Sequence, residues 1–107
     1  MTFKTYFYLL IIQGREPTDR DWLALDQAVE RAWPGFHTEL SQGIPLRQKE
    51  CRMCLLMKVG LPDKEIEYLL GYSQKSLSTI KRRVLAKIYG INGPAKELKQ
   101  RIRMYGH

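Results

Sequence analysis

The sequence predicts an all-α protein that forms a single helical domain, and three observations support this. Apolar residues recur with the helical period of 3.6 in the second half of the chain. From residue 18 onward, no segment alternates apolar and polar residues as a strand does. A length of 107 residues with 44% hydrophobic content suits one globular domain.

The first element is an apolar run at residues 6–12. It is too short to span a bilayer, and no small-residue cleavage site of a signal peptide follows it. Its β-branched and aromatic residues leave both a helix and a strand open. We therefore expect it to pack on the domain, with no membrane insertion by this chain.

Three helices are predicted next. Thr18 stands three residues before Asp21, which is a variant of the capping box and starts a helix over about residues 19–33. A short helix follows over about residues 36–41. A proline then opens a longer helix over about residues 46–59.

Residues 63–80 are the most informative stretch of the sequence. A short helix ends at Gly71, which supplies a turn, and Ser73 can cap a second helix. The apolar face of this second helix holds Leu77, Ile80, Val84 and Ile88. Such spacing is typical of a helix-turn-helix, whose second helix enters the major groove of DNA.

The opposite face of the second helix is polar and basic. It carries Lys75, Ser78, Thr79 and Arg82. Small hydroxyls allow a close approach to DNA, and Lys or Arg side chains reach base edges or phosphates. The alternative is an ordinary solvated face of an amphipathic helix.

The order of these motifs resembles the DNA-binding domain of LuxR-type regulators. The resemblance rests on residues 60–66, 70–73 and 83–87 with Leu77, and it extends over roughly residues 18–105. This fold is similar to the C-terminal promoter-reading domain of sigma factors. The resemblance is closest to cytoplasmic C-terminal domains of Bacteroidetes regulators, which often follow tetratricopeptide repeats and a membrane span. That subgroup shares Asp21-Trp22 with Leu25, Pro34-Gly35-Phe36, Cys54-Leu55-Leu56-Met57-Lys58 and Lys87-Ile88-Tyr89-Gly90.

The resemblance implies a cytoplasmic transcription regulator that binds double-stranded promoter DNA through a recognition helix at about residues 73–89. It implies that bases are faced by Lys75, Ser78, Thr79 and Arg82. It implies that phosphates are held by Gln74, Lys81, Arg83 and Lys87. It also favours a helix at residues 6–12, and RNA polymerase becomes a candidate partner.

A last helix is predicted over about residues 95–105, with Leu98, Ile102 and Tyr105 on one face. The resemblance implies a homodimer through this helix. The pattern itself suits packing, dimerisation or binding at a membrane interface equally well.

Two positions depart from the LuxR pattern. Pro62 stands where a Ser or Thr cap is usual, but proline suits a first helical turn and Asp63 can interact with the helix dipole. Glu67 replaces a small residue where the two motif helices approach closely. We expect it to turn outward or to pair with Lys64 or Arg83.

Charge divides the chain into two parts. The net charge is +7, and the excess is concentrated after residue 46. This favours a polyanionic partner, either nucleic acid or an anionic membrane surface. We therefore expect a helical scaffold at residues 1–45 and a helix-turn-helix region with its C-terminal helix at residues 46–107. We expect five scaffold residues to pack against the helix that holds Cys54 and Leu55: Trp22, Leu25, Val29, Trp33 and Phe36.

Little in the sequence suggests an enzyme or a cofactor. Cys51 and Cys54 form a C-x-x-C pair, but a structural zinc site needs four ligands and the chain has only two histidines, His37 and His107. We interpret the cysteines as buried apolar side chains, and we expect no metal site. An aromatic ligand pocket is an alternative role for Trp22, Trp33 and Phe36. The alternative to DNA reading is a regulatory module that docks on RNA polymerase or a sensor partner.

Overall fold

The computed structural model describes residues 1–107 and contains seven α-helices and no strand. These are α1 (Phe3–Ile12), α2 (Asp19–Ala32), α3 (Phe36–Leu40), α4 (Gln48–Lys58), α5 (Asp63–Leu70), α6 (Gln74–Tyr89) and α7 (Ala95–Met104). The predicted all-α class is confirmed, and the apolar run at residues 6–12 is helical. None of the seven helices combines the length and apolarity needed to cross a bilayer.

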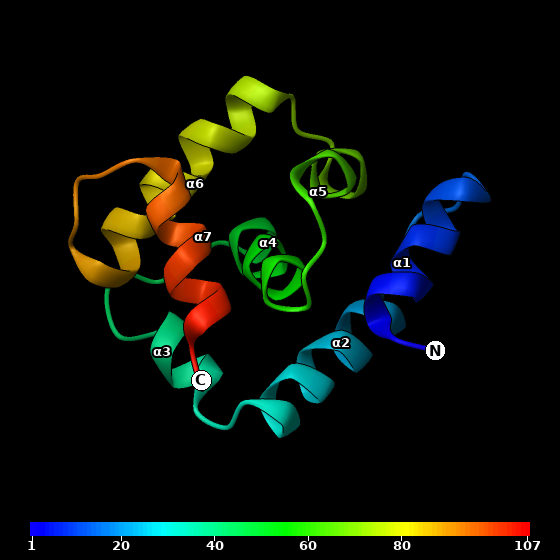
Figure 1. Cartoon of the computed structure of the whole chain (residues 1–107), viewed down its shortest axis with the longest axis horizontal. Coiled ribbons are helices and arrows are strands. Elements are labelled where there is room, and N and C mark those ends of the chain that lie inside the picture. Colours follow the sequence, from blue (N-terminus) through cyan, green and yellow to red (C-terminus); the bar gives the residue numbers. More distant parts are fainter.

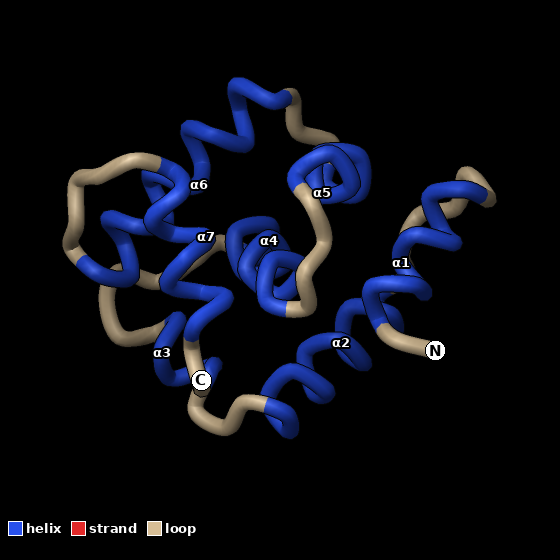
Figure 2. Tube along the Cα trace, in the orientation of Figure 1, coloured by secondary structure: helices blue, strands red, loops and turns tan.

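α4 is the central helix, and the other helices surround it (Figures 1 and 2). Residues 53–58 are all buried, as is Glu50. A helix that is covered on all sides belongs in the interior, and α2, α5 and α7 all pack against this one. It begins at Gln48, later than predicted, because Arg47 is the N-cap residue and its N–H donates to Glu50 Oε1 at 2.7 Å.

One hydrophobic cluster of 21 buried residues joins the two parts of the chain. From α4 it includes Cys54 and Leu55, the two residues against which the scaffold was predicted to pack. From the scaffold it includes Trp22, Leu25, Val29 and Phe36, with Trp33 half-buried at its edge. The predicted single core is therefore present, and the scaffold and the helix-turn-helix region share it.

α1 and the start of α2 are fixed by a capping box and a tyrosine. The Thr18 N–H donates to Asp21 Oδ2 at 2.8 Å, and the Asp21 N–H donates to Thr18 Oγ1 at 3.2 Å, as predicted. The Tyr6 hydroxyl donates to the other oxygen of the same carboxylate, Oδ1, at 2.6 Å. Phe7 adds an aromatic contact, with its ring centroid 5.3 Å from that of Trp22.

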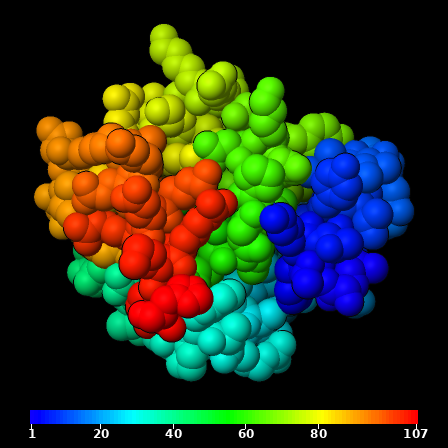
Figure 3. Space-filling model, viewed as in Figure 1, coloured from blue at the N-terminus to red at the C-terminus, as the bar shows by residue number.

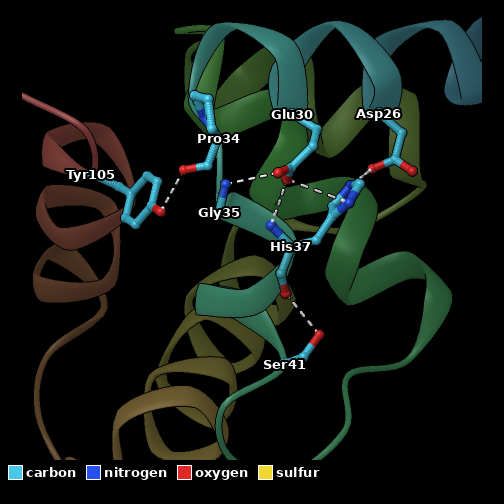
Figure 4. Close-up of polar contacts among 7 residues, drawn as sticks. All are labelled: Asp26, Glu30, Pro34, Gly35, His37, Ser41 and Tyr105. Carbon is cyan, nitrogen blue, oxygen red and sulfur yellow. Dashed lines mark hydrogen bonds and ion pairs between the residues drawn. The ribbon is translucent and has the colours of Figure 1, made fainter.

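The corner between α2 and α3 is held from both sides (Figure 4). The Glu30 carboxylate accepts the N–H of Gly35 at 2.7 Å and the N–H of His37 at 3.0 Å, so α2 caps the short α3. These two bonds lower the pKa of Glu30. On the other side, the Tyr105 hydroxyl donates to the Pro34 carbonyl at 2.9 Å. The C-terminal segment is thereby tied to this corner.

The loop between α3 and α4 lies directly on the end of α6. The Ile44 N–H donates to the Lys87 carbonyl at 2.8 Å. A Cβ atom added to Gly43 would lie 1.9 Å from the same carbonyl oxygen, so only glycine fits there. The Tyr89 hydroxyl donates to Glu39 Oε2 at 2.8 Å, which links the end of α6 to α3 itself.

Candidate nucleic-acid interface

α5 and α6 are joined by a three-residue turn at residues 71–73, with the helix ends that the sequence predicts. Gly71 has φ 71°, and its N–H and that of Tyr72 both bond to the Glu67 carbonyl. Ser73 caps α6, because its Oγ accepts the Ser76 N–H at 3.1 Å. Pro62 is the N-cap residue of α5. In Figure 1, α5 is seen nearly end-on while α6 runs across the picture, so the two helices are not parallel.

The outward face of α6 is a continuous exposed stripe. Its members are Lys75, Ser78, Thr79, Arg82, Arg83 and Ala86. They are spaced at i, i+3, i+4, i+7, i+8 and i+11, which is one side of a helix. No carboxylate lies within 4.0 Å of any cation on this stripe. All four side chains predicted to face bases therefore lie on one side of α6 and are exposed.

Positive charge is concentrated in the part of the chain that contains this stripe. Residues 1–45 hold four Lys or Arg and six Asp or Glu, whereas residues 46–107 hold fourteen and five. Among the predicted phosphate ligands, Gln74 and Arg83 are exposed. Both can therefore reach a partner that approaches α6.

The other two predicted phosphate ligands, Lys81 and Lys87, point into the protein. Lys81 is 4% exposed, and its Nζ donates to Asp63 Oδ1 at 2.6 Å. The Nζ atom of Lys87 donates to Glu50 Oε1 at 2.8 Å. Both ammonium groups already serve ion pairs within the protein. The helical period contains the signal for Lys81, because this residue lies between Leu77 and Val84 on the apolar stripe.

The Asp63–Lys81 pair links the start of α5 to the middle of α6. Lys99 of α7 also lies near it, with its Nζ 3.8 Å from Asp63 Oδ1. Burial raises the pKa of Asp63, but the Lys81 hydrogen bond and the surrounding positive charges outweigh burial and lower it. The carboxylate therefore stays ionised and ties the two motif helices to α7. Glu67 makes no ion pair and is half-exposed.

Glu50 plays a similar role under the end of α6. It is 2% exposed and accepts from both the Arg47 N–H and Lys87. Burial raises the pKa of Glu50, but the two hydrogen bonds and the Lys87 charge together lower it. Its second oxygen, Oε2, is buried and has no partner. The pair fixes the far end of α6 against α4.

Sequence reasoning missed a second group of cations beside the turn. Arg15, Lys49 and Arg52 line a cleft of about 550 Å³ that also includes Gly71. Arg52 pairs with Asp19 at 3.6 Å, whereas exposed Lys49 has no carboxylate partner. The Lys49 Nζ lies 4.9 Å from the ring centroid of Tyr72, next to the Ser73 cap. Lys49 and Arg52 come from α4 and Arg15 from the loop before α2, so no single local pattern could have identified the group.

A pocket on α2, α3 and α4 brings together the side chains that could suggest catalysis. His37 lies between Asp26, which it contacts through Nε2, and Glu30, whose Oε1 is 3.4 Å from Nδ1 (Figure 4). Cys51 lines the same pocket of about 490 Å³ but makes no hydrogen bond to His37. Burial raises the pKa of Cys51, and the charges of Glu50 and Asp26 add to this effect. The thiol therefore stays protonated and is a poor nucleophile.

The two cysteines differ in burial. Cys54 is fully buried as predicted, but Cys51 is only half-buried. No group of three or more His, Cys, Asp or Glu side chains is placed to hold a metal ion.

The three aromatic residues considered as a ligand pocket contact different neighbours. The Trp22 ring packs on Phe7. The Phe36 ring lies 5.6 Å from Tyr105. Trp33 lies under the ammonium group of Lys58, with 4.5 Å between the nitrogen and the ring centroid. These three aromatic rings pack at separate places in the protein and do not form one shared pocket.

The apolar face of α7 is used inside the protein. Leu98 and Ile102 are fully buried, Tyr105 is half-buried, and α7 packs on α6 and α4. The sequence left packing, dimerisation and membrane binding open for this face, and in the structure it serves packing. The exposed residues of α7 are Lys96, Gln100, Arg101 and Met104.

Comparisons with family models, curated proteins and solved structures find no significant match to this chain. Its function must therefore be inferred from the side chains themselves.

Proposed function

We propose that this protein is a DNA-binding transcription regulator that reads promoter DNA through a LuxR-like recognition helix, α6. The observation that carries the proposal is the exposed stripe on α6, which presents three cations without carboxylate partners together with two small hydroxyl side chains. A major groove about 12 Å wide admits one α-helix. A helix of 16 residues is long enough to lie along it.

In this proposal the first turns of α6 make the closest approach to DNA. Lys75, Ser78, Thr79 and Arg82 face the bases, because they lie on the centre of the stripe. Phosphate contacts come from Gln74 and Arg83 at the edges of the helix and from Lys49 beside the turn. Phosphate contacts position the protein, and base contacts give it sequence preference.

The ion pairs beneath α6 support the proposal because they make the stripe rigid. Asp63 holds Lys81 near the middle of the helix, and Glu50 holds Lys87 near its end. A recognition helix that is fixed before binding loses less conformational freedom on the DNA.

A homodimer through α7 would use the outward face of this helix, since its apolar face is buried. That face is mostly polar and basic. We therefore propose that each protomer contacts DNA by itself, and that a second copy binds to an adjacent half-site.

The proposal is tested on duplexes selected from a random library. Arg82→Ala and Thr79→Ala should each weaken binding to the selected duplex by about 1–3 kcal/mol, with unchanged circular dichroism. Arg31→Ala, an exposed arginine on α2, is the matched control and should bind like wild type. If no sequence is enriched, or if both α6 variants bind like wild type, the proposal is wrong.

A second candidate function is docking on RNA polymerase or a sensor partner. It is favoured by large apolar side chains that are at least half-exposed outside α6: Tyr8, Ile12, Leu23 and Tyr68. This candidate predicts no enriched duplex in the selection.

A further inference from the structure

A third cleft, of about 600 Å³, lies between α1, α2, the end of α4 and α7. Its volume is in the range of small-molecule sites. Its apolar wall consists of Phe3, Ala28, Val29, Ala32, Trp33 and Val59. Figure 3 shows the four elements meeting on the viewed face, and no residue of α6 lines the cleft. The site is therefore separate from the proposed DNA surface.

The charges of this cleft are all of one sign. Lys4, Lys58 and Arg103 line it, and no carboxylate does. Lys58 is 6% exposed, and neither it nor Arg103 has a carboxylate within 4.0 Å. By contrast, the buried lysine Lys81 is paired with Asp63, and half-buried Lys87 is paired with Glu50.

Backbone carbonyls accept some of the N–H groups of Lys58 and Arg103 without neutralising their charge. Lys58 Nζ donates to the carbonyls of Arg103, at 3.1 Å, and Tyr105. Arg103 donates to the carbonyls of Met57 at 3.4 Å and Leu61 at 3.3 Å. These bonds close the C-terminal ends of α4 and α7, where cations are favourable.

That structural role still leaves positive charge beside an apolar wall. A buried cation without a counter-ion is costly, and burial lowers the pKa of Lys58 accordingly. An anion that also carries apolar surface would complement both features of the cleft.

We propose that this cleft binds a small amphipathic carboxylate, a monoanion with one aliphatic or aromatic body. Its carboxylate would lie near Lys58 and Arg103, and its body would lie against Ala28 and Trp33. The inference is independent of DNA binding, because it uses no residue of the proposed DNA surface.

The probe for this site is octanoate, compared with octan-1-ol and octyltrimethylammonium. The chain has two tryptophans, so Trp22→Phe leaves Trp33 in the cleft wall as the only one. Octanoate should cause a saturable change in Trp33 fluorescence, with one-to-one stoichiometry by calorimetry. Octan-1-ol should bind at least about tenfold more weakly, a loss of about 1.4 kcal/mol, and the cation should not bind.

Two variants locate the site. Ala28→Phe should abolish binding by filling the cleft while leaving both cations in place. Arg103→Met should reduce octanoate affinity to that of octan-1-ol, whereas Lys96→Met on the exposed face of the same helix should have no effect. Circular dichroism checks that each variant is folded. Equal binding of octanoate and octan-1-ol, no saturable binding at all, or full binding by folded Ala28→Phe would each overturn the proposal.

Discussion

The two parts of the chain use their charged side chains differently. In residues 1–45, the carboxylates of Asp21 and Glu30 serve backbone N–H groups and fix helix ends. In residues 46–107, Lys81 and Lys87 serve ion pairs within the protein, while the stripe on α6 keeps its cations without carboxylate partners. The count of basic residues therefore overstates the basic surface. What matters for a polyanionic partner is which cations are exposed and unpaired.

The largest expected effect tests whether the two parts fold as one unit. Phe36 is fully buried in the shared core and contacts Tyr105 from the other end of the chain. Phe36→Ala should cost about 3–5 kcal/mol, the usual figure for deleting a buried aromatic side chain. Urea unfolding should show one transition for both parts, by circular dichroism and by tryptophan fluorescence. Two separate transitions would mean that the scaffold is an independent module.

The next effect concerns the buried pair under α6. Glu50→Gln should cost about 3 kcal/mol at pH 7, because it leaves Lys87 without its counter-ion. The folded pKa of Glu50 lies below its ordinary value of 4.5, so its stabilisation is complete above pH 4.5. That stabilisation is lost as the pH falls through the folded pKa, so the difference between variant and wild type should shrink in acid.

The control for this pair is Glu67→Gln, which changes a half-exposed carboxylate without an ion pair. It should alter stability by less than about 0.5 kcal/mol. Guanidinium unfolding between pH 3 and 7 measures both variants. A Glu50→Gln effect that is equally small would show that the pair adds nothing to the position of α6.

A smaller effect concerns the contact between the α3–α4 loop and α6. Gly43→Ala places a Cβ 1.9 Å from the Lys87 carbonyl oxygen, which is backbone and cannot rotate away. We expect a loss of about 2 kcal/mol, within the range for overpacking. Gly93→Ala is the control, since its nearest contacts are 3.4 Å away and are side chains. Equal thermal unfolding midpoints for the two variants would argue against tight docking of this loop.

The sequence predicted the helix-turn-helix boundaries well because local signals set them. Gly71 and Ser73 act on their own neighbours, and the period of 3.6 separates the two faces of α6. The same period also places Lys81 between Leu77 and Val84 on the apolar side, whereas its role as a phosphate ligand came from the resemblance to LuxR-type domains. A lysine side chain can turn inward when a carboxylate of a neighbouring helix is within reach.

Other parts of the site could not be predicted from local patterns. Lys81 and Asp63 are 18 residues apart, and Lys87 and Glu50 are 37 apart. The cleft between α1, α2, α4 and α7 combines residues from the two ends and the middle of the chain. Such contacts depend on how whole helices pack, which periodicity does not specify.

The central claim is that the exposed cations of α6, and not its ion-paired lysines, contact DNA. The salt dependence of duplex binding tests it most directly, because log K falls with log salt by about 0.9 for each phosphate neutralised. Fluorescence anisotropy across a salt series should show a steep slope for wild type. Arg83→Ala should reduce that slope by about 0.9, and folded Lys81→Met should leave it unchanged. A flat wild-type slope, or an equal reduction in Lys81→Met, would contradict the account.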